Sequence, residues 1–334
     1  MHKTSQFAIV ILAIISLFSC QPKKEYIRNE GLIFGTIYHM TYEHNQDLSD
    51  TITKVLNAFD WSMSTYKEES VISKINRNVS DETDAYFRQV FNKATEITAA
   101  TDGAFDMTVA PLVNAWGFGF SKKDSITPAL IDSILDNVGM DMLQLRGNMI
   151  IKKKPGIMLD GSAIAKGFAV DVVANLLDAF EVQNYMVEIG GEMRVKGQNP
   201  KSTAWHVGID KPIDDPEVQN RALQEIIGIS DVALATSGNY RNFYIKAGKK
   251  YAHTISPFTG YPVSHQLLGV SVLAPNCMSA DAYATGFMVL GFEKSLQIVE
   301  SHPELEAYFI MAGDEKEYKI HATKGFSACI IADE

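Results

Sequence analysis

One segment late in the chain limits the possible folds more than any other, because a strand pattern passes directly into a helix pattern. Apolar residues alternate with small or polar ones over residues 268–273, which predicts a half-buried strand. Ser279 is a good N-cap residue, and the alanine-rich run after it favours a helix. In that helix Asp281 and Thr285 are four residues apart, so they lie on one face.

A carboxylate and a hydroxyl on adjacent helical turns suit a hard cation such as Mg2+, which prefers oxygen ligands. The alternative is structural: Asp281 complements the helix N-terminus, and Thr285 bonds back to a carbonyl of its own helix. The pair alone does not decide between these interpretations. The choice of metal also stays open, because Mn2+ and Ca2+ accept the same oxygens.

A second strand-to-helix transition lies at residues 158–171 and contains several small residues. Small residues at such a turn let a ligand approach the backbone closely. The helix start and Lys166 offer positive charge to an anion. An ordinary capped turn with a solvated lysine is the alternative, and the spacing alone favours it.

Three further features are candidates for a site. Residues 104–119 are rich in glycine and aromatics without any period, which indicates an irregular segment of the kind that often lines sites. Tyr66 lies in a polar loop, and in a purely structural interpretation its half-buried ring anchors that loop. His253 lies on a predicted strand, and a lone histidine there is more often structural than catalytic.

Composition and charge narrow the function. The 334 residues carry a formal net charge of -10 and are 46% hydrophobic, enough for a sizeable core in one large or two intimate domains. The net negative charge argues against a surface that binds nucleic acid or a broad anionic membrane. Because the protein is acidic, an anionic substrate would need local positive charge from a metal or from a few lysine or arginine side chains at the site. Three cysteines are too few for a disulfide framework. The Rossmann fingerprint is absent, since Gly117-Phe-Gly119 lacks the third glycine. The sequence also contains no GxxxxGK(S/T) phosphate-binding loop.

The N-terminus predicts an export signal. The apolar run over residues 7–18 is 12 residues long, too short for a comfortable membrane span. It ends in Leu17-Phe18-Ser19-Cys20, which resembles a bacterial lipobox, in which the cysteine is lipidated and becomes the mature N-terminus. An ordinary cleaved signal with an incidental cysteine is the alternative.

These features divide the chain into three parts. We expect a signal peptide over residues 1–19, a lipidated Cys20 with a polar tether over 20–30, and one domain over 31–334. The expected location is the outer, periplasmic side of the cytoplasmic membrane, reached through the lipid anchor.

Seven motifs in order, from about Gly31 to the C-terminus, make the chain resemble the ApbE family of bacterial flavin transferases. They are Ser64-Thr-Tyr66-Lys…Ser70, Thr101-Asp-Gly-Ala-Phe-Asp106…Pro111-Leu-Val…Trp116-Gly-Phe-Gly119, Asp160…Lys166-Gly-Phe-Ala-Val-Asp171, Glu188-Ile-Gly-Gly191, Thr236-Ser-Gly238, His253…Pro257-Phe-Thr-Gly260 and Ala280-Asp-Ala-Tyr-Ala-Thr285. The resemblance implies an α+β fold of mixed and antiparallel sheets flanked by helices. FAD is then expected in a central cleft between residues 31–125 and the sheet that carries His253 and Asp281.

The resemblance also implies a reaction. FAD is cut at its pyrophosphate, AMP leaves, and FMN is attached through a phosphoester to a threonine or serine of a separate flavoprotein. Acceptors carry a Ser/Thr-Gly-Ala-Thr/Ser type motif. This chain has no such run, so it is expected to be the enzyme and not its own acceptor.

The roles of the metal and the base follow from the same resemblance. Mg2+ is held by Asp281, Thr285 and the backbone carbonyl of Ala163. At the position of Ala284 some members supply a carboxylate, and here only the backbone is available. His253 is the candidate base that takes the proton from the incoming hydroxyl.

Eight positions match residues that line FAD in the family, and two of them depart from the usual residue. The family usually has methionine where this chain has Phe34, and some members carry glutamate at the position of Lys166. The eight positions are Phe34, Tyr66, Ala104, Phe105, Asp106, Asp160, Lys166 and His253.

Two other functions remain open: hydrolysis of FAD to free FMN and AMP, and flavin binding without catalysis.

Overall fold

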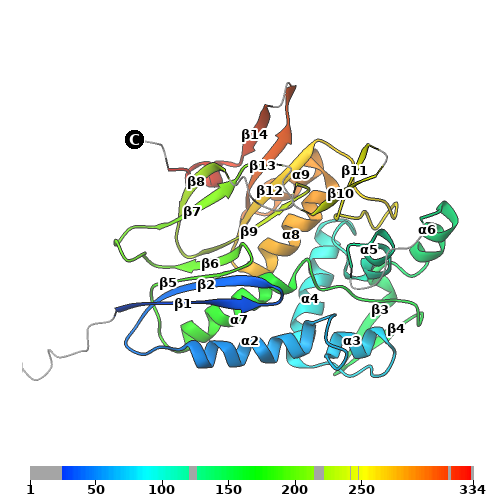
Figure 1. The fold of residues 1–334 in the computed structure, drawn as a ribbon, viewed down its shortest axis with the longest axis horizontal. Helices are drawn as coiled ribbons and strands as arrows, with labels where there is room; N and C mark the ends of the chain where they lie inside the picture. The colour runs from blue at the N-terminus through cyan, green and yellow to red at the C-terminus, as the bar shows by residue number, and fades with distance from the viewer. Residues whose placement is uncertain are drawn as a thin grey trace, which may run out of the picture.

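The computed structural model describes residues 25–119, 126–213, 222–240, 242–246, 248–314 and 317–331. Its centre is an eight-stranded sheet in which every neighbouring pair of strands is antiparallel (Figure 1). In spatial order the strands are β1 (Glu25–Ile33), β2 (Thr36–His44), β5 (Tyr185–Ile189), β6 (Glu192–Lys196), β9 (Val232–Gly238), β12 (Leu267–Ala274), β13 (Glu306–Ala312) and β14 (Tyr318–Ala322).

Three two-stranded antiparallel sheets surround this centre. They pair β3 (Leu143–Arg146) with β4 (Met149–Lys152), β7 (Trp205–Asp210) with β8 (Leu223–Ile229), and β10 (Phe243–Lys246) with β11 (Lys249–Ala252).

Helices cover one face of the central sheet. Helix α7 packs on β5 and β6, helix α8 packs on β9 and β12, and α2 and α4 form an outer layer against them (Figure 1). The helices are α2 (Ser49–Met63), α3 (Val71–Asn76), α4 (Ala85–Ala100), α5 (Ala110–Trp116), α6 (Pro128–Leu135), α7 (Ala165–Ala179), α8 (Cys277–Leu290), α9 (Phe292–Ser301) and α10 (Lys324–Ser327).

The central sheet separates two cores, because successive side chains of a strand point to opposite faces. In β12, Val272 lies in the large core under the helices, and the next residue, Leu273, lies in a second core. That second core is closed by Trp205 of β7 and Ile227 of β8. The predicted α+β fold with antiparallel sheets and flanking helices is confirmed.

Two expectations about local structure are wrong. Residues 25–30, expected to belong to the tether, form the first part of β1, since all nine residues of that strand pair with β2. The expected irregular segment 104–119 contains a 3₁₀ turn at Met107–Val109 followed by helix α5, which is too short to show a helical period in sequence. The signal peptide, Cys20 and the rest of the tether lie outside the described residues. Among the described helices, none has the length and apolar composition that a membrane span requires.

Candidate active site

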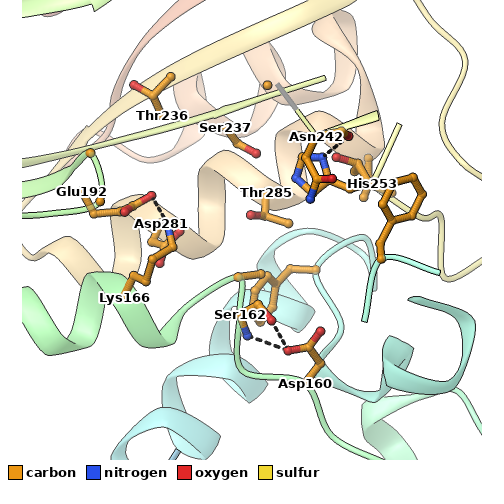
Figure 2. Close-up of a pocket in the computed structure, with 18 of the residues that line it drawn as sticks. Asp160, Ser162, Lys166, Glu192, Thr236, Ser237, Asn242, His253, Asp281 and Thr285 are labelled. Carbon is orange, nitrogen blue, oxygen red and sulfur yellow. Dashed lines mark hydrogen bonds and ion pairs between the residues drawn. The ribbon is translucent and has the colours of Figure 1, made fainter. Parts of the chain in front are cut away.

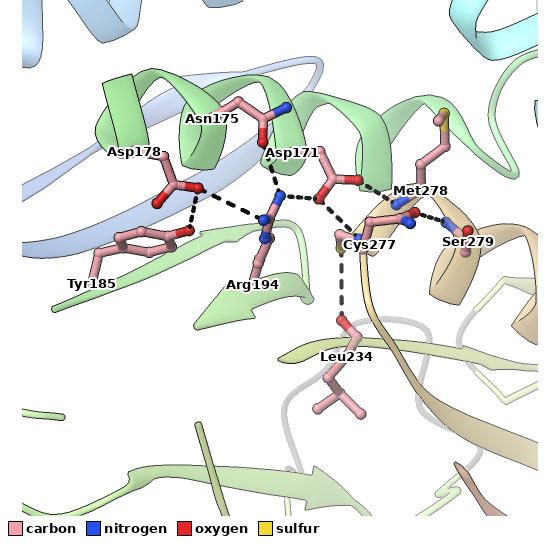
Figure 3. Close-up of polar contacts among 10 residues, drawn as sticks. Asp171, Asn175, Asp178, Tyr185, Arg194, Leu234, Cys277, Met278 and Ser279 are labelled. Carbon is pink, nitrogen blue, oxygen red and sulfur yellow. Dashed lines mark hydrogen bonds and ion pairs between the residues drawn. The ribbon is translucent and has the colours of Figure 1, made fainter. Parts of the chain in front are cut away.

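Helix α8 begins earlier than its sequence predicts. Its N-cap is Asn276, whose side chain accepts a 2.9 Å hydrogen bond from the N–H of Ser279, so Ser279 lies inside the first turn. A second acceptor comes from helix α7. The carboxylate of Asp171 accepts from the N–H groups of Cys277 and Met278 at 3.0 and 2.8 Å (Figure 3). The first N–H groups of α8, which have no partner within the helix, are thereby satisfied.

A partly buried arginine holds the capping carboxylate. Arg194 of β6 donates to Asp171 at 3.2 Å and to Asn175 at 3.0 Å (Figure 3). Burial raises the pKa of Asp171, and its hydrogen bonds from Cys277 and Met278 and the charge of Arg194 oppose that rise. This network fixes the start of α8 against α7 and β6.

Helix α7 touches α8 at a glycine. The N–H of Gly167 donates a 2.9 Å hydrogen bond to Oδ2 of Asp281. A Cβ atom at Gly167 would lie 2.3 Å from the carbonyl oxygen of Cys277 and 2.7 Å from Cβ of Asp281. Only glycine therefore permits this close approach, and the approach fixes the Asp281 carboxylate.

Asp281 and Thr285 lie on one face of α8 and open onto a cleft with a volume of about 800 Å³. Figure 2 shows Thr285 between His253 and Asp281, with Asp160 across the cavity. The sequence-predicted residues that line this cleft are Tyr66, Ala104, Phe105, Asp106, Asp160, Ala163, Lys166, His253, Asp281 and Thr285.

Three oxygens in this cleft suit a cation. Oδ2 of Asp281 accepts from Gly167, which leaves its second carboxylate oxygen for a ligand. The Thr285 hydroxyl makes no hydrogen bond to any described residue, so the structural interpretation, in which it bonds back to its own helix, is wrong. No N–H in the described chain donates to the Ala163 carbonyl oxygen. A carboxylate, a hydroxyl and a carbonyl are donors that fit Mg2+.

Ala284 does not belong to this set. Its side chain is 1% exposed in the core, and the residue does not line the cleft. In the described part of the chain no cluster of three or more His, Cys, Asp or Glu side chains is arranged to hold a metal. A metal here would therefore depend on the hydroxyl and carbonyl oxygens as well as on Asp281.

Lys166 is paired and is not simply solvated. Its Nζ lies 2.5 Å from Oε1 of Glu192, the first residue of β6 (Figure 2). Burial opposes the charged lysine, but Glu192 and Asp281 outweigh this and raise the pKa of Lys166. Burial raises the pKa of Glu192 to about 7 despite the nearby ammonium group. The second oxygen of Glu192 has no hydrogen-bond partner in the described protein.

His253 is oriented as a base. Its Nδ1 lies 3.1 Å from the carbonyl oxygen of Asn242. Because a carbonyl only accepts, Nδ1 carries the proton and Nε2 keeps its lone pair. Burial lowers the pKa of His253, against a smaller opposing effect of Asn242, and nearby Lys166 lowers it further. The imidazole is thus neutral at pH 7.

Tyr66 and Asp160 offer side chains to a ligand. Tyr66 is 80% exposed, so its interpretation as a half-buried anchor is wrong, and its ring is free to stack on a ligand. Asp160 accepts hydrogen bonds from the N–H and hydroxyl of Ser162, which fix the carboxylate at the edge of the cleft (Figure 2).

The segment at 104–106 contributes differently. The carboxylate of Asp106 accepts from the N–H and hydroxyl of Thr108 and from the N–H of Met140. The ring of Phe105 is buried. Because both side chains are engaged in the fold, this segment offers a ligand mainly its main chain.

Phe34 is not part of the cleft. It lies in the turn between β1 and β2 with φ of 53°, and its ring packs edge-on against Phe59 at 5.8 Å between centroids. The turn directs this residue into the helical layer and away from the residues that line the cavity.

Sequence reasoning missed Glu192 and Asn242. Glu192 directly follows Gly190-Gly191, a break between two strands, and only that break marks it in the sequence. Asn242 acts through its main-chain carbonyl, which no sequence pattern reveals.

Comparison with known proteins assigns the chain to a family. A sequence model described as the ApbE family matches residues 34–309. The chain belongs to the ApbE family. A curated relative from Haemophilus influenzae, named FAD:protein FMN transferase, is 38% identical over 331 residues, which cover 94% of each protein. A second relative of that name from Vibrio cholerae is 36% identical and covers 95% of this chain and 98% of its own.

Solved structures of ApbE proteins agree with this assignment. The flavin transferase ApbE from Vibrio cholerae superposes with a TM-score of 0.82 at 35% identity, covering 92% of this chain and 99% of that one. The Pseudomonas stutzeri flavinyl transferase ApbE, in its apo form, gives 0.81 at 28% identity and covers 93% of this chain and 98% of its own. The resemblance stated from the motifs is confirmed, and the chain is a transferase.

Proposed function

We propose that this ApbE protein transfers FMN from FAD to a threonine or serine hydroxyl of an acceptor flavoprotein, in a Mg2+-dependent reaction that releases AMP. One observation carries the proposal: a base and a set of cation ligands lie in the same cleft. The base is Nε2 of His253, which keeps its lone pair. The cation ligands are oxygens of Asp281, Thr285 and Ala163 that accept no hydrogen bond from the described protein. The name FAD:protein FMN transferase, borne by the curated relatives, supports it.

The proposed step is a displacement at phosphorus. The acceptor hydroxyl oxygen forms a bond to the phosphorus of the FMN half of FAD. The bond from that phosphorus to the bridging oxygen breaks, and AMP leaves with the oxygen. The acceptor proton goes to Nε2 of His253, which is neutral at pH 7 because burial lowers its pKa.

The cation has a defined place in this proposal. Asp281, Thr285 and the Ala163 carbonyl would hold it at the cleft floor. Bound Mg2+ supplies positive charge that neutralises the pyrophosphate and the charge developing on AMP. Gly167 supports this role by fixing the Asp281 carboxylate through its N–H.

The flavin and its phosphates would lie along the wall opposite β9. Tyr66 stacks on a ring of FAD, the main chain at 104–106 offers hydrogen bonds, and Asp160 accepts from a ligand hydroxyl or N–H. Lys166 carries positive charge beside the proposed pyrophosphate position, held there by Glu192.

Mass spectrometry tests the proposal. The protein is incubated with FAD, Mg2+ and an acceptor bearing the Ser/Thr-Gly-Ala-Thr/Ser run, and the acceptor is weighed. A gain of one FMN phosphoester supports transfer. Free FMN and AMP with an unchanged acceptor identify a hydrolase, and intact bound FAD identifies a flavin-binding protein without catalysis.

We also propose that Cys20 carries a lipid anchor at the outer face of the cytoplasmic membrane. The apolar run at 7–18 and the lipobox-like end at Cys20 support this. Labelled palmitate should enter the wild-type protein in cells and not Cys20→Ser. Equal labelling of both would contradict the anchor.

A further inference from the structure

Strand β7 meets the cleft along its edge. Five consecutive residues, 206–210, line the cavity. Side chains of a strand alternate between two faces, so a cavity that touches every residue in turn lies against the strand edge and not against one face. Burial agrees, because Val207 and Ile209 pack into the second core and His206 and Gly208 are exposed.

This edge is unpaired in the described protein. Strand β7 pairs with β8 alone, and residues 206–209 make no other main-chain hydrogen bond to a described residue. The far edge of β8 is covered near the C-terminus. There the Gly228 N–H donates to Cys329 at 2.8 Å, and the Ile331 N–H donates to Ile226 at 2.9 Å. The edge left open in this two-stranded sheet is the one at the cleft.

The proposed chemistry places neither FAD nor the cation against the β7 edge of the cleft. The residues assigned to FAD and the cation come from segments 66–166, His253 and α8, and none comes from β7. The reaction needs a second substrate in the same cleft at the same time, and that substrate is a polypeptide. An unpaired strand edge recognises a polypeptide, since it offers main-chain N–H and C=O groups in a regular row.

We propose that the acceptor segment binds as an added strand along the β7 edge at residues 206–209, so that its threonine or serine enters the cleft beside His253. This inference rests on the proposed function. Main-chain hydrogen bonds to β7 would supply affinity with little dependence on acceptor sequence, because every residue except proline carries the same groups. Alternate main-chain groups of the acceptor face β7, and the intervening ones face away.

A backbone scan of the acceptor tests this without altering the enzyme. The probe is a synthetic peptide with the Ser/Thr-Gly-Ala-Thr/Ser run, N-methylated at one amide at a time. Each methyl group that removes a hydrogen bond to β7 should raise the peptide KM about tenfold. Methylation at the intervening amides is the matched control and should change KM less than about twofold. The KM for FAD should stay constant throughout.

The outcomes separate the docking site from the function. Loss of binding at every second amide supports the β7 edge. Transfer without such alternation overturns the docking site and leaves the transferase function intact. FAD cleavage with no FMN on any unmethylated peptide overturns the proposed function and the docking site with it.

Hydrogen–deuterium exchange identifies the occupant independently. Unmethylated peptide should slow exchange at one or more amides of residues 206–209, and saturating FAD alone should leave these amides unchanged. Slowing by FAD alone would assign the edge to the nucleotide and overturn the inference. Slowing that depends on protein concentration without peptide would assign it to a second copy of the chain, with the same consequence.

Discussion

The N–H of Gly167 donates a 2.9 Å hydrogen bond to Oδ2 of Asp281, which ties the start of helix α7 to helix α8. The two helices come close enough for this bond because Gly167 has no Cβ. The proposed cation ligand is therefore fixed by a residue on a different helix, more than one hundred positions earlier in the chain.

Replacing Gly167 should damage both stability and activity. In Gly167→Ala the new Cβ meets the main-chain carbonyl of Cys277, which cannot give way as a flexible side chain does. We expect a loss of about 1–3 kcal/mol in the free energy of unfolding and weaker Mg2+ binding. Thermal unfolding and calorimetric Mg2+ titration measure these. Gly228→Ala is the control, since its Cβ would meet only side-chain atoms, the end of Ile331 at 3.3 Å and the Cβ of Ala204 at 3.6 Å. Equal stability of the two variants would contradict the packing argument.

Removing the charge of Asp281 should separate catalysis from folding. Asp281→Asn keeps an oxygen for the Gly167 N–H and removes a buried carboxylate whose pKa is raised by burial. We expect transfer to fall about a hundredfold or more with no drop in the melting temperature of the metal-free protein. Asp314→Asn, at an exposed carboxylate, is the control and should leave transfer unchanged. Full Mg2+-dependent activity in Asp281→Asn would remove Asp281 from the site.

The pH dependence of transfer should report His253. A base must be neutral, and burial lowers the pKa of His253 below its ordinary 6.5. The rate should therefore stay high as pH falls through 6.5 and decline only at the lower, folded-state pKa. In His253→Gln the decline of the rate at low pH should disappear, and the rate itself should fall by about two or more orders of magnitude. Initial rates at saturating FAD measure it, and a wild-type decline centred above pH 6.5 would contradict the assignment.

The same histidine also affects stability. Its folded-state pKa lies below its unfolded one, so the unfolded chain binds more protons between the two values. The contribution of His253 is fully present above pH 6.5 and is lost as pH falls toward the folded-state pKa. Unfolding free energies of wild type and His253→Gln should therefore converge or cross as pH falls through this window. A difference that is constant across the window would show that the pKa of His253 is not lowered.

Tyr66 should act on FAD affinity alone. Its ring is 80% exposed and has no packing role, so Tyr66→Ala should leave the melting temperature unchanged. Loss of stacking should raise the KM for FAD about tenfold. Tyr66→Phe, which keeps the ring, should behave like the wild type. An unchanged KM in the alanine variant would place FAD elsewhere.

Local patterns predict which residues can meet, and long-range packing decides which of them do. The four-residue spacing of Asp281 and Thr285 was sufficient to place them on one helix face, and the structure confirms this. The N-cap is harder to predict, because Asn276 and Ser279 are both good capping residues. The capping carboxylate of Asp171, distant in sequence, helps to select the earlier start.

The errors among the site residues have similar causes. Phe34 matches a flavin-lining position of the family, but the β1–β2 turn directs its ring against Phe59. Ala284 is one position from Thr285 and still faces the core, since neighbouring helical residues point about 100° apart. Glu192 was missed because its role depends on the approach of Lys166 from another element.

FMN transfer by protein stripped of divalent metal tests the proposed cation site most directly. Chelator-treated enzyme is mixed with FAD and an acceptor carrying the threonine motif, and the acceptor is weighed before and after Mg2+ is restored. We expect no FMN on the acceptor without metal and stoichiometric FMN once Mg2+ is added. Transfer at the full rate by the stripped enzyme would contradict the assignment of Asp281, Thr285 and Ala163 as the ligands of a required cation.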